Sequence, residues 1–119
     1  MTVAGHRHER IAEEIHHEIS TMVAGELKDP RIAGLVTVTE VRLSPDRRQA
    51  RVFVSVLGTD EEQASTIQGL EAARGFIRHE LAERLRMRRC PDLQFVLDHS
   101  EEYGQRIEDL LRTTKKNDG

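Results

Sequence analysis

Several residue types are scarce in this sequence, and each shortage excludes a class of protein. Aromatic residues make up only 3% of the chain and include no tryptophan, too few for a platform that stacks single-stranded bases. The single cysteine, Cys90, can form neither an internal disulfide nor a four-cysteine zinc site, which fits a reducing compartment. Apolar runs reach three residues at most, too short for a membrane span or a signal peptide. We therefore expect a cytoplasmic protein with no membrane partner.

The sequence also lacks the residue spacings on which enzymes and metal sites depend. It has no Gly-x-Ser-x-Gly nucleophile motif and no glycine-rich phosphate loop. His8-Glu9 and His17-Glu18 begin like a zinc-protease motif, but neither has the second histidine four residues after the first. His6, with His8 and Glu9, offers at best an adventitious metal site at a frayed terminus. We expect no enzyme activity, no cofactor, no metal site and no small-molecule substrate.

The residues that are abundant suit one folded domain. Of the 119 residues, 37% are hydrophobic and 33% are charged, which allows one core beneath a strongly ionised surface. We expect a single domain over residues 1–112. Residues 113–119 include no hydrophobic side chain, so we expect a disordered polar tail there.

The beginning of the chain predicts one amphipathic helix. Apolar residues recur at three- and four-residue intervals over residues 8–27, which places them on one face of a helix. A residue that precedes proline is pushed out of the helical region of backbone space. Pro30 therefore predicts that the helix stops near Lys28.

The next segment predicts a β-hairpin. Residues 35–43 are rich in valine and threonine, but their apolar positions change parity after Val38, which predicts a bulge or burial on both faces. Ser44-Pro45-Asp46 favours a turn, and residues 50–56 alternate apolar and polar side chains. We expect two antiparallel strands.

A capping box predicts the start of the next helix, because Thr59 and Glu62 have the spacing that satisfies the first free amides. The apolar stripes of residues 64–70 and 77–85 would place Arg74 inside the apolar arc of one straight helix. A break near Ala73-Arg74-Gly75 releases Arg74 toward solvent. The alternative is a straight helix from which Arg74 extends to the surface.

The remaining elements complete the predicted fold class. Residues 93–97 alternate as a third strand, and Ser100 is expected to cap a final helix. The order is helix, strand, strand, helix, helix, strand, helix. This order predicts an α+β domain with a three-stranded sheet and helices packed on one face.

Positive charge is concentrated in one segment of an acidic chain. The net charge is −3, yet residues 74–89 contain six arginines and two glutamates, a net +4. Arginine forms bidentate contacts with phosphate, so the segment indicates an RNA-phosphate surface. The alternatives are a helix end whose arginines complement the helix dipole, and a genome rich in G and C. The six residues are Arg74, Arg78, Arg84, Arg86, Arg88 and Arg89.

Several strings occur in a distinctive joint order. They are Arg10 to Ile19 with the Glu18-Ile19-Ser20 helix end, Lys28-Asp29-Pro30-Arg31-Ile32, Val36-Thr37-Val38-Thr39-x-Val41, Ser44-x-Asp46, Val52-x-Val54-Ser55-Val56-Leu57-Gly58, Ala73-Arg74-Gly75-Phe76-Ile77-Arg78 and Pro91-x-Leu93-x-Phe95. Together they resemble the ribosome-binding factor A family of bacterial small-subunit assembly factors. The similarity extends from about residue 6 to residue 112.

The resemblance implies a KH-like fold of the second topological type, in which an Ala-x-Gly kink, here Ala73 and Gly75, replaces the usual Gly-x-x-Gly loop. It implies binding to 16S rRNA in the free small (30S) ribosomal subunit and assistance with late 16S rRNA maturation, most important in the cold. We expect a monomer. Some members have a long basic C-terminal extension that anchors RNA, whereas this tail is Lys115-Lys116-Asn117-Asp118-Gly119. The folded domain is therefore expected to supply the affinity.

Our hypothesis from the sequence is that nine arginines contact rRNA phosphates, namely the six above with Arg7, Arg10 and Arg31. Reversing Arg74 and Arg78 to glutamate is expected to abolish subunit binding and leave the fold intact. One alternative is an accessory to a metal-dependent nuclease. The main alternative is a protein-interaction module that binds a basic ribosomal protein through an acidic last helix containing Glu101, Glu102, Glu108 and Asp109.

Overall fold

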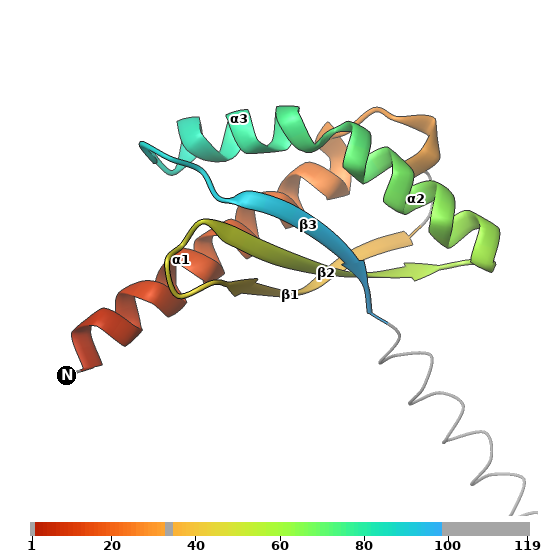
Figure 1. The fold of residues 1–119 in the computed structure, drawn as a ribbon. Helices are drawn as coiled ribbons and strands as arrows, with labels where there is room; N and C mark the ends of the chain where they lie inside the picture. Colours follow the sequence, from red (N-terminus) through yellow and green to blue (C-terminus); the bar gives the residue numbers. More distant parts are fainter. Residues whose placement is uncertain (1, 33–34, 99–119) are drawn as a thin grey trace, which may run out of the picture.

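The computed structural model of this chain describes residues 2–32 and 35–98. Its elements, in chain order, are α1 (Thr2–Thr21), the π-helical turn η1 (Met22–Glu26), the 3-10 turn η2 (Pro30–Ile32), β1 (Leu35–Leu43), β2 (Gln49–Leu57), α2 (Asp60–Ala72), α3 (Arg74–Arg84) and β3 (Asp92–Leu97). The fold is α+β, in the predicted order as far as β3 (Figure 1). The predicted final helix and polar tail lie outside the described residues.

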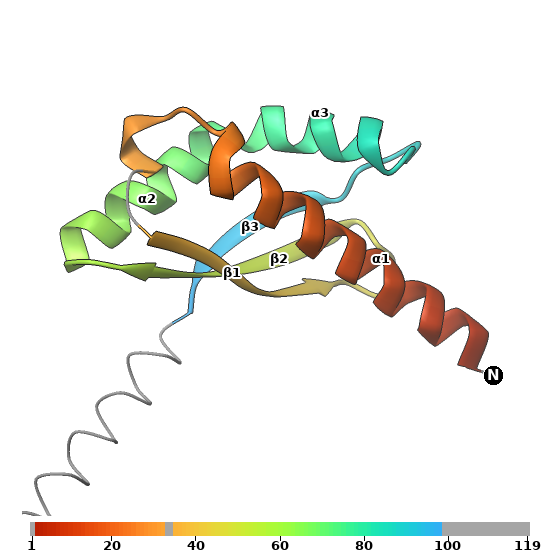
Figure 2. The ribbon, with the colours of Figure 1, turned by 180° about the vertical axis from the view of Figure 1, so that it is seen from behind.

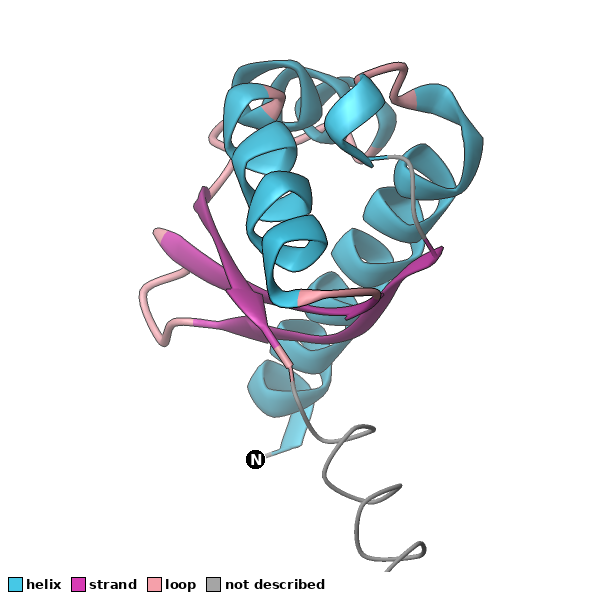
Figure 3. Ribbon diagram, turned by 90° about the vertical axis from the view of Figure 1, so that its right-hand side faces the viewer, coloured by secondary structure: helices cyan, strands magenta, loops and turns pink. Residues whose placement is uncertain are grey.

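The three strands form one mixed sheet in the order β1-β2-β3. β1 and β2 pair antiparallel, as predicted for a hairpin, whereas β2 and β3 run parallel because α2 and α3 return the chain between them. The helices pack against one face of the sheet, and the first turns of α1 run past its edge (Figures 2 and 3). We call the opposite face, on which Arg42, Arg51, Phe53 and Gln94 lie, the outer face.

The core lies between the helices and the inner face of the sheet. Ile15, Ile19 and Met22 are fully buried, which confirms the apolar stripe predicted for the first helix. Helical structure begins at Thr2, earlier than the stripe indicated, and ends at Glu26, close to the predicted stop. The remaining buried apolar residues come from all three strands and the helix pair: Val38, Val41, Ala50, Val52, Val54, Val56, Leu70, Ile77, Leu81, Leu93 and Phe95.

The change of parity in β1 is a β-bulge. Val38 pairs with Val54 and Glu40 pairs with Phe53, so Thr39 is the extra residue in the register. The bulge turns the following residues over and brings apolar residues on both sides of it to the core. The Thr39 hydroxyl donates to Asp98 Oδ2 at 2.6 Å, which connects the bulge to the end of β3.

The helix pair is bent where the sequence predicted a break. A capping box between Thr59 and Glu62 starts α2, and Ala73, with φ −86° and ψ 0°, separates α2 from α3. Gly75 lies within α3, so Ala73 is the residue that bends the chain. Gly69 fulfils a different need, because a Cβ there would lie 2.7 Å from Ile32 Cγ1 of η2.

Candidate nucleic-acid interface

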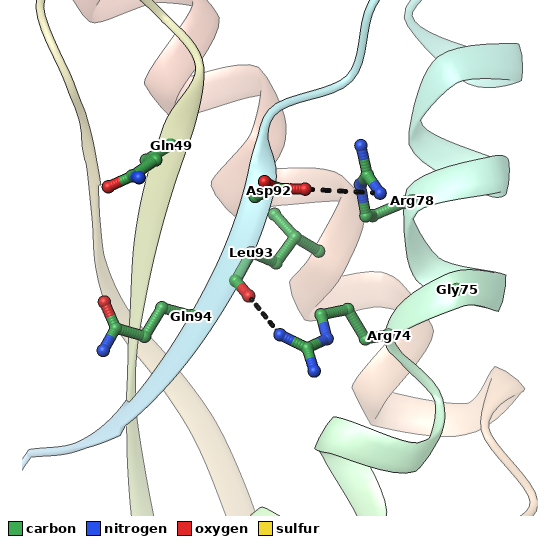
Figure 4. Close-up of a pocket in the computed structure, with 7 residues that line it drawn as sticks. All are labelled: Gln49, Arg74, Gly75, Arg78, Asp92, Leu93 and Gln94. Carbon is green, nitrogen blue, oxygen red and sulfur yellow. Dashed lines mark hydrogen bonds and ion pairs between the residues drawn. The ribbon is translucent and has the colours of Figure 1, made fainter.

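A groove of about 540 Å³ lies between α3 and the start of β3 (Figure 4). Arg74 and Arg78 project from α3 on one side of β3, while Gln49 and Gln94 lie on its other side. Gly75 also lines the groove, and nothing lies within 4 Å of the position that a Cβ would take there. The bend thus brings two of the predicted arginines to one wall of a polar groove. The full lining is Gln49, Arg74, Gly75, Arg78, Asp92, Leu93 and Gln94.

Arg74 is turned toward the edge of β3 and keeps part of its guanidinium accessible. Its Nη1 donates to the Leu93 carbonyl at 3.3 Å, and its Nη2 lies 3.0 Å from Glu71 Oε2. The side chain is 48% exposed. Because a guanidinium has five N–H donors, these two contacts leave donors that can reach a ligand in the groove.

Arg78 holds the backbone that leads into β3. Its Nε donates to the Pro91 carbonyl at 3.1 Å and its Nη2 to the Cys90 carbonyl at 3.0 Å. Its Nη1 also lies 3.4 Å from Asp92 Oδ1. An Arg78→Glu substitution would leave the Pro91 and Cys90 carbonyls without their donor and place a glutamate beside Asp92. The expectation that a glutamate at this position spares the fold is therefore not supported by these contacts.

Arg84 is surrounded by carboxylates from three elements. Its guanidinium pairs with Glu26 of η1, with Glu18 of α1 at 3.4 Å and with Glu80 of α3 at 3.0 Å. The hydrogen bond with Glu26 is the largest cause that raises the pKa of Arg84, and it lowers the pKa of Glu26. With three anions around one cation, this residue joins α3 to α1. Arg84 therefore has little positive charge to offer to RNA.

Three more of the nine predicted arginines, Arg31, Arg10 and Arg7, do not line the groove. Arg31 forms a bidentate pair with Asp29, at 3.0 and 2.7 Å, and its hydrogen bonds lower the pKa of Asp29 to about 2. Arg10 is 81% exposed and only 3.9 Å from Glu14. Arg7 is exposed on the first turns of α1.

Five arginines gather at one end of the molecule. The Asp92 amide donates to the Arg48 carbonyl at 2.8 Å, so the β1–β2 turn lies beside the α3–β3 loop (Figure 1). Within residues 2–32 and 35–98, no carboxylate forms an ion pair with any of the five. We call this surface the basic end; it comprises Arg47 and Arg48 of the turn and Arg86, Arg88 and Arg89 of the loop.

Two acidic residues beside the basic end, Asp46 and Asp92, have partners of their own, whereas the exposed Glu83 lines a hollow together with Arg86. Asp46 accepts from the Ser44 hydroxyl at 2.7 Å and from the Arg48 amide at 3.0 Å, which lowers the pKa of Asp46. Asp92 pairs with Arg78. The charge of Arg48 contributes to the lowered pKa of Asp46. All five arginines are exposed and form no ion pair within the described ranges, so their guanidinium groups are accessible to an external anion.

The arginines of the β1–β2 hairpin were not among the predicted site residues. Residues 42–51 contain four arginines and one acidic residue, a density that could have been noticed. The prediction was based on one continuous segment, residues 74–89. The hairpin arginines come next to the α3–β3 loop only through the pairing of β2 with β3. The four are Arg42, Arg47, Arg48 and Arg51.

Two further findings concern the described residues. They contain no group of three or more histidine, cysteine, aspartate or glutamate side chains placed to hold a metal ion. They also contain no helix with both the length and the apolar character that crossing a membrane requires.

The bent helix pair, the mixed sheet and the polar groove between them define a KH-like α+β domain. The sequence profile of the family described as Ribosome-binding factor A matches residues 7–111. A ribosome-binding factor A from Caldanaerobacter subterraneus is 44% identical over 114 residues, covering 96% of this chain and 93% of the relative.

Solved structures show the same similarity. The crystal structure of ribosome-binding factor A from Thermus thermophilus matches with a TM-score of 0.67 and 30% identity, over 76% of this chain and 93% of that one. A homology model of the Thermus factor, fitted into a cryo-EM map of its complex with the 30S subunit, matches with a TM-score of 0.63, 30% identity and the same coverage. The chain belongs to the ribosome-binding factor A family.

Proposed function

We propose that this protein binds the small ribosomal subunit and that the α3–β3 groove and the basic end contact phosphates of 16S rRNA. The observation that carries the proposal is the basic end, where five exposed arginines that form no ion pair with a carboxylate in the described part of the chain lie on a protein of net charge −3. Family membership supports the choice of partner, since the Thermus relative has been fitted into a map of a 30S complex.

The distribution of charge gives the bound protein a preferred orientation. Phosphates attract the basic end and repel the acidic remainder, so an approaching molecule turns this end toward the RNA. Phosphate contacts fix the position of a protein on RNA without reading its sequence. We therefore expect the protein to recognise the shape of folded rRNA, which places phosphates against the groove and the basic end, and not a particular base sequence.

We further propose that binding assists late maturation of 16S rRNA without catalysis by this protein. A ligand can favour one arrangement of its partner only by binding that arrangement more tightly. Contacts distributed over the groove and the basic end require several phosphates to be in register at once. Binding of this kind stabilises one rRNA arrangement while other factors or nucleases act on it.

Binding to purified small subunits at several salt concentrations tests the proposal. Each lost phosphate contact is expected to reduce the slope of log affinity against log salt by about 0.9. Arg88→Gln with Arg89→Gln should therefore flatten the slope by about 1.8 and weaken binding at low salt. The single variant Arg89→Gln should flatten the slope by about 0.9. Its control is Lys28→Gln, which also removes one exposed charge, but outside the groove and the basic end.

The two outcomes differ clearly. The proposal is supported when the arginine variants lose affinity and slope while Lys28→Gln matches the wild type. It is refuted when the double variant co-sediments with small subunits as well as the wild type at every salt concentration.

A further inference from the structure

The outer face of the sheet carries a row of polar residues that continues from the α3–β3 groove. Gln94 of β3 pairs in register with Arg51 of β2, and Arg51 pairs with Arg42 of β1. Adjacent strands lie about 4.8 Å apart, so the row crosses the sheet in roughly 10 Å. Gln49 lines both the α3–β3 groove and a second hollow of about 230 Å³, which Arg42, Leu43, Ser44 and Arg51 also line. The groove and the row are therefore continuous.

The charges of this row are incompletely compensated within the described protein. Like charges directly opposite each other on neighbouring strands destabilise a sheet. Arg42 is relieved by Glu40, 2.6 Å from its Nε, and by the Phe53 ring, whose centroid lies 5.4 Å from its guanidinium carbon. Arg51 is exposed and forms no ion pair with a carboxylate in the described ranges. An external anion would remove the repulsion.

The turn beside the row contains an unusual backbone conformation. Arg47 has φ 60°, a region that glycine or asparagine occupies at lower cost than arginine. An arginine held in such a conformation calls for a role that its side chain supplies. The Arg47 and Arg48 side chains are exposed next to Ser44, at the end of the row.

We propose that the outer face at its hairpin end is a second RNA contact, which takes a single-stranded segment that leaves the α3–β3 groove past Gln49. Arg51 binds its phosphates together with Arg47 and Arg48, which the second contact shares with the basic end. Gln94 offers an amide to base edges, and Arg42 over the Phe53 ring provides a surface for one base. This proposal rests on the proposed binding of rRNA and extends it from the groove to the sheet.

A single strand fits this surface better than an acidic peptide. In most interfaces with a protein or peptide, a few anchor side chains in well-packed, desolvated pockets carry most of the binding energy. The hollow next to Arg42 and Arg51 is small and Leu43 is the one apolar residue in its lining, so it offers no such pocket. A single strand needs only a basic track and an occasional stacking group.

Fluorescence anisotropy of labelled oligouridine, about 12 nucleotides long, with the full chain tests the second contact. We expect Arg51→Gln to reduce the salt slope by about 0.7 and to weaken binding several-fold at low salt. Lys28→Gln, which removes the same charge elsewhere, should change neither quantity. Arg47→Gly should weaken binding while raising the melting temperature, a combination that a purely structural role of Arg47 does not predict.

Parallel measurements separate this inference from the proposed function. Loss of binding in the Arg88→Gln, Arg89→Gln variant with wild-type binding in Arg51→Gln, the one arginine variant outside the basic end, overturns the second contact and leaves the first. A wild-type protein that binds neither oligouridine nor small subunits overturns both proposed contacts. Displacement of oligouridine from the wild type, but not from Arg51→Gln, by polyglutamate would assign the surface to acidic peptides and also overturn the proposal.

Discussion

Replacing Arg78 by methionine tests whether this arginine builds the groove as well as lining it. Methionine keeps much of the apolar stem but removes the donors to the Pro91 and Cys90 carbonyls. Hydrogen bonds to charged groups contribute about 1.5–3 kcal/mol each, and the side chain is 39% exposed, so water replaces part of the loss. We expect a destabilisation of about 2 kcal/mol, or roughly 10 °C in melting temperature for a domain of this size.

Two further variants separate geometry from charge in this experiment. Arg78→Lys keeps the charge but cannot donate to both carbonyls in the same planar arrangement, so it should recover only part of the lost stability. Arg88 lies in the α3–β3 loop and its side chain forms no ion pair or hydrogen bond within the described ranges. Arg88→Met should therefore change the free energy of unfolding by less than about 0.5 kcal/mol. Urea unfolding measures all three. An Arg78→Met protein as stable as Arg88→Met would refute the reasoning.

The remaining predictions concern stability away from the phosphate contacts. Gly75→Ala has free space for its methyl group within α3, so thermal unfolding should show a gain of about 0.5–1 kcal/mol. Gly69→Ala places a methyl group 2.7 Å from Ile32 Cγ1, so the same assay should show a net loss, and equal effects of the two alanines would contradict the packing argument. Folding lowers the pKa of Asp29 from 3.8 to about 2, so its stabilisation is complete above pH 4 and disappears as the pH falls through 2. Asp29→Asn should therefore be less stable than wild type near pH 6 and equal to it below pH 2, and a difference independent of pH would count against the Arg31 pair.

The features that the sequence predicted well depend on neighbours along the chain. The parity change after Val38 indicated the bulge because side chains alternate strictly in a strand. The phases of two apolar stripes located the bend at Ala73, since a straight helix would have buried Arg74. The spacing of Thr59 and Glu62 was sufficient to predict the helix start.

The features that the sequence did not predict depend on partners far apart in the chain. Arg84 meets Glu18 and Glu26, 66 and 58 residues away, so its neutralisation could not be inferred from the basic segment alone. The hairpin arginines join the α3–β3 loop only because β3 pairs with β2 and not with β1. The basic segment therefore included Arg84, whose charge three carboxylates neutralise, and left out the four arginines of residues 42–51.

Directed hydroxyl-radical probing of small subunits tests most directly whether the basic end faces ribosomal RNA. On a Cys90→Ala background, iron-EDTA would be tethered through Pro45→Cys in the exposed β1–β2 turn or through Lys28→Cys after η1. The account predicts strong, localised cleavage of 16S rRNA from position 45 and weak cleavage from position 28. Stronger cleavage from position 28, or none from position 45 in a complex shown to form, would contradict it.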